Sequence, residues 1–156
     1  MPRFIKQYDD YNCGPVAIVN ALKWAGVKAT HAHVKKFNCI CKTTEDMGTT
    51  ISAIHKALDG TKVFKIVRLY NPPIKRIDEH INRGGAVLYG STKVKTGNAY
   101  EGHYALIVSR SENRFGVCNL EPPGKAFRNC SRKRFIKKYM KRFKYDKPVV
   151  WLLTIK

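Results

Sequence analysis

A cysteine that directly precedes the most apolar stretch of the chain constrains the fold more than any other feature. Cys13-Gly14-Pro15 leads into VAIVNALKWA, and Gly26 follows. Proline is tolerated in the first turn of a helix and glycine commonly ends one, so the sequence predicts a helix over residues 14–25. Because this helix has few polar residues, we expect it to be buried on most sides as the central helix of the fold.

The rest of the chain changes from helical to strand-like patterns along its length. We expect helices at about 30–37, 50–58, 74–81 and 131–143. Apolar runs that predict strands are KVFKIVRL, AVLYGS, HYALIVS, RFGVCNL and VVWLLTI. This order predicts an α+β fold with a helical N-terminal lobe and an antiparallel β-sheet C-terminal lobe. At 156 residues, without repeats or linker-like segments, we expect residues 1–156 to form a single domain.

The place of Cys13 before a helix favours nucleophilic chemistry. The helix dipole and unpaired amides there stabilise negative charge, so we expect the thiol pKa to fall below its ordinary value of about 8.5. Gly14 would let a substrate backbone pass close to the sulfur. The side-chain amide of Gln7 could donate beside the backbone N–H of Cys13, and two such donors would form an oxyanion hole. The alternative is a buried cysteine at a helix end with no chemical role.

His103 has the best sequence context for a general base among the five histidines, because it follows a glycine and opens the strand YALIV. Asn119 ends the next predicted strand sixteen residues later, so a hairpin could bring the two side chains together. The amide oxygen of Asn119 would then hold the imidazole in the productive tautomer, as in a Cys-His-Asn arrangement. The alternative for Asn119 is an ordinary turn residue before a proline-rich segment.

Three blocks of the sequence, in this order, resemble the bacteriocin-processing peptidases that act on double-glycine leaders. QYDDYNCGP is similar to the Q-x5-C-G opening of that family, GHYALIV to its His block, and NLEPPG to its Asp-Pro block. SRKRFIKKY stands in the place of its late helix. Members of the family are the cysteine peptidase domains of certain ABC exporters, and the resemblance covers nearly the whole chain.

The resemblance implies a papain-like fold and the hydrolysis of peptide bonds through an acyl-enzyme. Cys13, His103, Asn119 and Gln7 would take the four catalytic positions, with neither a cofactor nor a metal. Asn119 stands where the family usually has aspartate, and asparagine is the residue that papain itself uses. The implied partner is a polypeptide substrate, with a Gly-Gly site as one candidate. No apolar run approaches the roughly 20 residues that span a bilayer, so we expect a stand-alone peptidase without a membrane span.

A net charge of +19 predicts an acidic partner of some kind. Basic residues are densest in the segment 125–147, where eleven Lys and Arg meet one acid. This segment is either the solvated side of a helix or a footprint for phosphates, so an alternative function is nucleic-acid binding on a papain-like scaffold. Another alternative is an acyl transferase of transglutaminase type, because its first steps use the same thiolate.

Two further patterns bear on metal binding and location. His31, His33, Cys39 and Cys41 form H-x-H-x5-C-x-C, but this spacing is unusual for structural zinc, and we favour solvated histidines and buried thiols. The opening MPRFIKQYDD lacks the apolar core of a secretory signal, and the scattered cysteines do not form a disulfide framework. We therefore expect a cytoplasmic protein; the alternative is a virus-encoded peptidase that acts in the host cell or virion.

Overall fold

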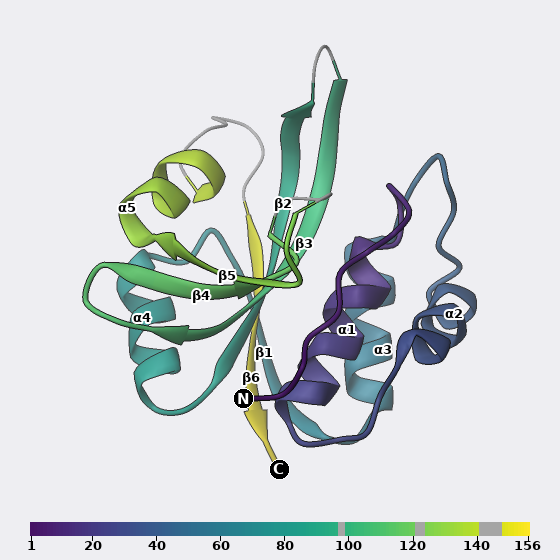
Figure 1. The fold of residues 1–156 in the computed structure, drawn as a ribbon, viewed down its shortest axis with the longest axis horizontal. Helices are drawn as coiled ribbons and strands as arrows, with labels where there is room; N and C mark the ends of the chain where they lie inside the picture. Colours follow the sequence, from purple (N-terminus) through teal and green to yellow (C-terminus); the bar gives the residue numbers. More distant parts are fainter. Residues whose placement is uncertain (97–98, 121–123, 141–147) are drawn as a thin grey trace.

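The computed structural model describes residues 1–96, 99–120, 124–140 and 148–156, which form a six-stranded sheet with helices on both faces (Figure 1). The helices are α1 (Cys13–Trp24), α2 (His31–Ile40), α3 (Ile51–Gly60), α4 (Ile74–Asn82), α5 (Arg132–Phe135) and the π-helical turn η1 (Ile136–Met140). The strands are β1 (Phe64–Tyr70), β2 (Ala86–Thr96), β3 (Ala99–Arg110), β4 (Arg114–Cys118), β5 (Phe127–Ser131) and β6 (Val149–Ile155). Their order in the sheet is β1-β6-β2-β3-β4-β5, and every neighbouring pair is antiparallel.

Helix α1 is the buried central helix that the sequence predicts. Every residue from Cys13 to Leu22 is buried. The helix packs against β3 on one side and against α2 and α3 on the other, and Figure 1 shows these three helices together on one side of the sheet. Other elements therefore cover α1 on several sides, and this explains why the segment carries so few polar side chains.

Side chains alternate between the two faces of the sheet, and each face has its own apolar core. In β6, Trp151 and Leu153 belong to the core that contains α1, whereas Val150 and Leu152 belong to the core that contains α4. Strand segments covered on both faces have no need of a polar face, so AVLY in β2, YALIV in β3 and VVWLL in β6 are continuous apolar runs.

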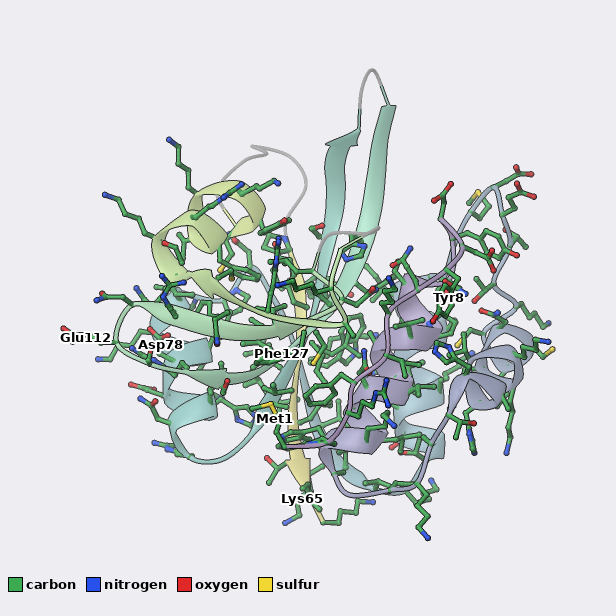
Figure 2. The ribbon with its side chains drawn as sticks, viewed as in Figure 1. Met1, Tyr8, Lys65, Asp78, Glu112 and Phe127 are labelled. Atoms are coloured by element: carbon green, nitrogen blue, oxygen red, sulfur yellow. The ribbon has the colours of Figure 1, made fainter. Side chains whose placement is uncertain are left out.

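The face away from α1 contains an aromatic cluster and one partly buried ionic cluster. Tyr89 and Phe115 both make edge contacts with the ring of Phe135, at 5.2 and 5.4 Å between centroids. Asp78 on α4 accepts a hydrogen bond from Arg132 Nε (3.1 Å) and pairs with Arg110 Nη1 (3.1 Å). Figure 2 shows Asp78 on the α4 side of the molecule and Tyr8 on the α1 side.

The α+β class and the antiparallel sheet are confirmed, and the strand predicted from KVFKIVRL is present as β1. Strand β1 pairs with β6 at one edge of the sheet. Strand β5 at the other edge was not expected, because its sequence FRNCS is mostly polar. Within the part of the chain that the structure describes, it pairs with β4 alone. The expected helix at 131–143 is present as α5 and η1 up to Met140, and its remainder lies outside the described residues.

Candidate active site

Cys13 begins α1 and lines a hollow of about 480 Å³, which we call the Cys13 pocket. Tyr104 on β3 forms part of the same wall, and its hydroxyl donates to the carbonyl of Thr49 at 2.7 Å. Burial raises the pKa of Tyr104, and negative charge on Cys13 and Cys41 raises it further. Cys13 and Tyr104 therefore line the same hollow. The other lining residues are Asp10, Tyr11, Glu45, Asp46, Met47, Gly48, Thr49, Thr50, Ile51, Gly90, Ser91 and Val149.

Gly14 has a different role from the one expected of it. A β-carbon at this position would lie 2.8 Å from Cβ of Thr49 and 2.9 Å from Cδ1 of Ile54. These distances are shorter than ordinary van der Waals contacts, so the space beside Gly14 is already filled by the protein. Glycine is needed here because it lets the loop before α3 pack against the start of α1, which fixes one wall of the Cys13 pocket.

His103 is oriented by the main chain of Asn119. Its Nε2 lies 2.7 Å from the backbone oxygen of Asn119. Because a carbonyl oxygen can only accept, Nε2 carries the proton, and the neutral ring then has its lone pair on Nδ1. The expectation named the side-chain amide oxygen of Asn119 as the partner, so the residue agrees but the atom differs. The cause is local: Asn119 has a left-handed φ of 54°, a conformation that asparagine tolerates, which sets the direction of its carbonyl group.

The side chain of Asn119 instead holds Gln7 at two points. Its Oδ1 accepts from the backbone N–H of Gln7 (3.0 Å), and its Nδ2 donates to Oε1 of Gln7 (2.7 Å). Both side chains are buried, with exposed fractions of 2% for Asn119 and 6% for Gln7. Nε2 of Gln7 donates one of its two protons to the carbonyl of Asp9 at 2.8 Å. Gln7, Asn119 and His103 thus form one hydrogen-bonded chain across segments that are far apart in the sequence.

Strand pairing places the backbone of His103, one member of this chain, next to residues that line the Cys13 pocket. His103 lies directly opposite Ser91 in the β2–β3 register, and Tyr104 lies opposite Gly90. Ser91, Gly90 and Tyr104 all line the Cys13 pocket. The backbone of His103 therefore borders the pocket that Cys13 lines.

The other four histidines have structural contacts that account for them. Nε1 of Trp151 donates to His55 (3.3 Å), and a ring nitrogen of His80 lies 2.9 Å from the carbonyl of Leu153. His33 caps α2, where its Nδ1 accepts from the backbone N–H of Thr30. His31 is exposed and its ring contacts that of Tyr8. Within the described residues no three His, Cys, Asp or Glu side chains converge as metal ligands, so the H-x-H-x5-C-x-C pattern does not form a zinc site there.

The five cysteines are all thiols, in different surroundings. Burial raises the pKa of Cys41 to about 11 and raises that of Cys118 as well. Both are therefore protonated near neutral pH, and a protonated thiol is a poor nucleophile. Cys39 is exposed on the surface.

Sequence reasoning did not identify Tyr104 and the loop from Glu45 to Thr49 as parts of the site. Tyr104 follows a candidate catalytic histidine, but an aromatic residue in a strand is usually read as core. The loop becomes a pocket wall only through the tertiary contacts of Thr49, whose hydroxyl also lies 2.7 Å from that of Thr43. No local sequence pattern indicates that this loop would form a pocket wall.

No protein-family model and no curated protein matches the sequence. Solved structures do match, over nearly the whole of each chain. The peptidase domain of Streptococcus ComA, a bifunctional ABC transporter involved in quorum sensing, aligns with a TM-score of 0.72 and 18% identity over 98% of both chains. A putative C39-like peptidase from Bacillus anthracis aligns with a TM-score of 0.67 and 12% identity, over 99% of this chain and 96% of that one.

A third similar structure is a double glycine motif protease from an AMS/PCAT transporter, in complex with the leader peptide. It aligns with a TM-score of 0.63 and 11% identity, over 99% of this chain and 93% of the other. Among the described residues, none of the helices has the length and apolar character needed to cross a bilayer. At these low identities the similarity establishes architecture, and the chain has the papain-like α+β fold of the C39 peptidase domains.

Proposed function

We propose that this protein is a cysteine peptidase that hydrolyses peptide bonds, with Cys13 as its nucleophile. The observation that carries this proposal is the hydrogen-bonded chain of His103, Asn119 and Gln7 beside the pocket lined by Cys13. A cysteine at the N-terminus of a buried helix has its thiolate stabilised by the helix dipole. The fold shared with known peptidase domains agrees with this assignment.

In the proposed mechanism, His103 removes the proton from the thiol of Cys13 through Nδ1. That nitrogen is the basic one because Nε2 donates to the carbonyl of Asn119. The thiolate attacks the carbonyl carbon of the scissile peptide bond and forms a C–S bond. The resulting imidazolium then protonates the leaving amine as the C–N bond breaks, which leaves an acyl-enzyme. Water, deprotonated by the same imidazole, cleaves the thioester and restores the thiol.

The oxyanion of the tetrahedral intermediate requires hydrogen-bond donors. We assign this role to the backbone N–H of Cys13 and to the second N–H of the Gln7 amide, since the first donates to Asp9. Asn119 fixes the orientation of that amide, because its Nδ2 donates a hydrogen bond to Oε1 of Gln7. Asn119 is therefore a positioning residue twice: its carbonyl orients His103 and its side chain orients Gln7.

A polypeptide is the substrate that this chemistry requires, and a Gly-Gly sequence is the first candidate for the cleaved site. One similar structure is a double glycine motif protease in complex with its leader peptide. A peptide that ends in Gly-Gly before the scissile bond, compared with the same peptide ending in Leu-Leu, tests this choice directly.

Labelling with a peptidyl epoxide followed by peptide mapping tests the nucleophile. We expect one modified residue, Cys13, and loss of the modification in His103→Ala. Exposed Cys39 serves as an internal measure of nonspecific alkylation. Cys41, whose pKa is raised to about 11, should react only when the pH approaches that value, because its thiolate is scarce below it. Equal labelling of Cys13 and Cys39, or labelling of Cys13 that ignores His103, would contradict the proposal.

A further inference from the structure

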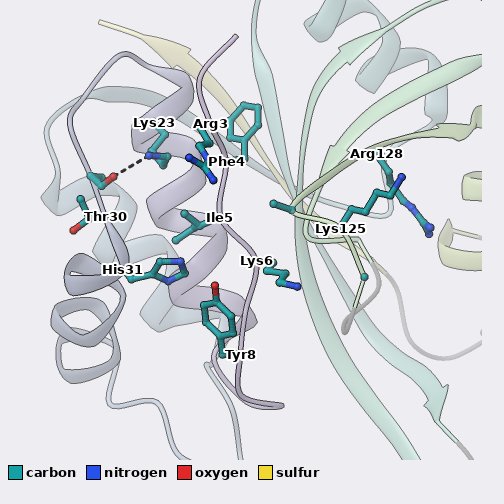
Figure 3. A pocket seen from close by; sticks show the side chains of 13 residues that line it. Arg3, Phe4, Ile5, Lys6, Tyr8, Lys23, Thr30, His31, Lys125 and Arg128 are labelled. Carbon is teal, nitrogen blue, oxygen red and sulfur yellow. Dashed lines mark hydrogen bonds between the residues drawn. The ribbon is translucent and has the colours of Figure 1, made fainter.

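A second and larger hollow lies on the α1 side of the molecule, outside the proposed catalytic residues. Its volume is about 900 Å³, and we call it the basic groove. Three parts of the chain form it: the N-terminal segment from Arg3 to Tyr8, the end of α1 with the start of α2, and the segment before and into β5 (Figure 3). Its lining residues are Arg3, Phe4, Ile5, Lys6, Tyr8, Lys23, Ala29, Thr30, His31, Gly124, Lys125, Ala126 and Arg128.

The basic groove is strongly one-sided in charge. Five of its lining residues are Lys or Arg, and none of them is Asp or Glu. Figure 3 shows Arg3 and Lys6 on the N-terminal segment and Lys125 and Arg128 on the part of the chain across from it. The Cys13 pocket has the opposite character, since three of its lining residues are acidic and none is Lys or Arg. An anionic ligand will therefore enter the basic groove in preference to the Cys13 pocket.

The groove also offers surfaces for flat apolar groups. Phe4 is buried and stacks on Phe127 at 5.9 Å between centroids, so its ring is held in place where it lines the groove. Tyr8 is 73% exposed, and its ring lies 5.0 Å from that of His31 at an angle of 47°. Because it is so exposed, Tyr8 contributes little to the apolar core. Its ring, at the edge of a cationic hollow, can instead stack on a flat group of a ligand.

We propose that the basic groove binds single-stranded nucleic acid. Grooves that bind single strands without sequence preference combine cations that follow the phosphates with aromatic rings that stack on the bases. A nucleic acid carries one negative charge on every nucleotide, which suits five cations around one hollow. In a duplex the bases are stacked on each other and are not accessible to Tyr8, so the single strand is the better ligand. An acidic peptide would use the cations but leave the ring of Tyr8 without a function.

Fluorescence anisotropy with a labelled oligothymidylate of about 12 nucleotides tests the proposal, since such grooves cover about 4 to 16 nucleotides. The groove variant is Arg3→Ala, Lys6→Ala and Lys125→Ala combined. The matched control is Lys133→Ala, Arg134→Ala and Lys137→Ala combined, which removes the same charges from exposed positions on α5 and η1. We expect the groove variant to bind at least about tenfold more weakly and the control to change by less than about threefold.

The salt dependence gives a second readout. Each phosphate contact to a single strand contributes about 0.7 to the slope of log K against log salt, so the groove variant should lose about 2 from that slope. Lys125→Glu alone tests the same groove by reversing one exposed charge, and it leaves the N-terminal segment unaltered. Tyr8→Ala should weaken binding by about 5- to 150-fold with an unchanged slope, because stacking is not ionic.

Four results would overturn the proposal. The first is the absence of oligothymidylate binding to the unaltered protein at low salt. The second is equal weakening by the groove variant and the α5 control, which would indicate attraction to the net charge alone. The third is tighter binding of a duplex of the same length. The fourth is displacement of the oligonucleotide by polyglutamate at equal charge concentration, which would make an acidic peptide the ligand.

Discussion

The two faces of the sheet use their buried polar residues for different purposes. On the α1 face, Asn119 joins Gln7, 112 residues away in the sequence, and its carbonyl orients His103 beside the Cys13 pocket. On the opposite face, Asp78 joins α4 to Arg110 and Arg132, and so ties together the elements that cover an aromatic core. The difference indicates that polar substitutions on the first face should cost activity, and those on the second should cost stability.

The largest expected effect tests the α1 face. Cys13→Ala should lower kcat by at least about four orders of magnitude, because it removes the thiol that forms the acyl-enzyme in the proposed mechanism. The thermal midpoint should stay close to that of the unaltered protein, since alanine fits the first position of a helix without strain. The rate of hydrolysis of a peptide substrate gives kcat, and a thermal melt gives the midpoint. Cys39→Ala, at an exposed position, is the matched control and should retain full activity. A Cys13→Ala protein that still turns over would end the assignment.

His103→Ala is expected to have the next largest effect on activity. Loss of the general base should lower kcat about 10²- to 10⁴-fold, and the fall should be smaller at high pH, where the thiolate forms without assistance. The pH profile of kcat/KM measures this, with His31→Ala as the control at an exposed histidine. If the pH profile of kcat/KM were unchanged in His103→Ala, another residue would have to be the general base.

Asp78→Ala tests the opposite face. Removal of the carboxylate leaves Arg110 and Arg132 without their partner in a site where the side chain of Asp78 is only 11% exposed. We expect a loss of about 3 kcal/mol in the free energy of unfolding, measured by urea denaturation, with activity per folded molecule unchanged. Glu112→Ala, at an exposed turn on the same face, should cost less than about 0.5 kcal/mol. A loss of turnover in folded Asp78→Ala would show that the two faces are coupled.

Asn119→Ala lies between these cases, because Asn119 serves both the fold and the site. It leaves the backbone N–H and Oε1 of buried Gln7 without partners, at a cost of about 1 to 3 kcal/mol in unfolding free energy. Activity should fall less than in His103→Ala, because the imidazole itself is retained, although alanine adopts the left-handed φ of 54° that directs the carbonyl less readily than asparagine does. Asn119→Asp keeps an acceptor for the Gln7 N–H but brings a second oxygen to Oε1 of Gln7, where neither atom can donate, so it should not recover the lost stability. Equal activities of Asn119→Ala and His103→Ala would contradict this division of roles.

The sequence was sufficient to predict the elements whose signals are local. Helix α1 followed from its proline, glycine and apolar content, and the central strands followed from their apolar runs. Strand β5 was missed because an edge strand needs no apolar face, and FRNCS carries little strand signal. Neighbours distant in the sequence also decide what Gly14 does, since Thr49 and Ile54 fill the space beside it.

The residues proposed for the site and the atoms through which they contact each other are predictable to different degrees. Gln7, His103 and Asn119 were chosen by residue type and spacing, and the structure joins them by hydrogen bonds, while their catalytic roles stay a prediction. The atom of Asn119 that contacts His103 depends on its left-handed φ of 54°, which no spacing rule encodes. The basic groove likewise combines Arg3, Lys23 and Lys125, three cations whose proximity arises only when the N-terminal segment lies against α1 and β5.

The smallest expected effect concerns charge within the α1 face. Asp10, Glu45 and Asp46 line the Cys13 pocket of a protein whose net charge is +19. Their local field should favour peptides with lysine or arginine near the cleaved bond over glutamate analogues, by about three- to tenfold in kcat/KM at low salt. Glu45→Gln with Asp46→Asn should reduce this preference, whereas Glu112→Gln on the far side should leave it unchanged. Because these groups are exposed, a preference that persists at 1 M salt would have to come from shape instead of charge.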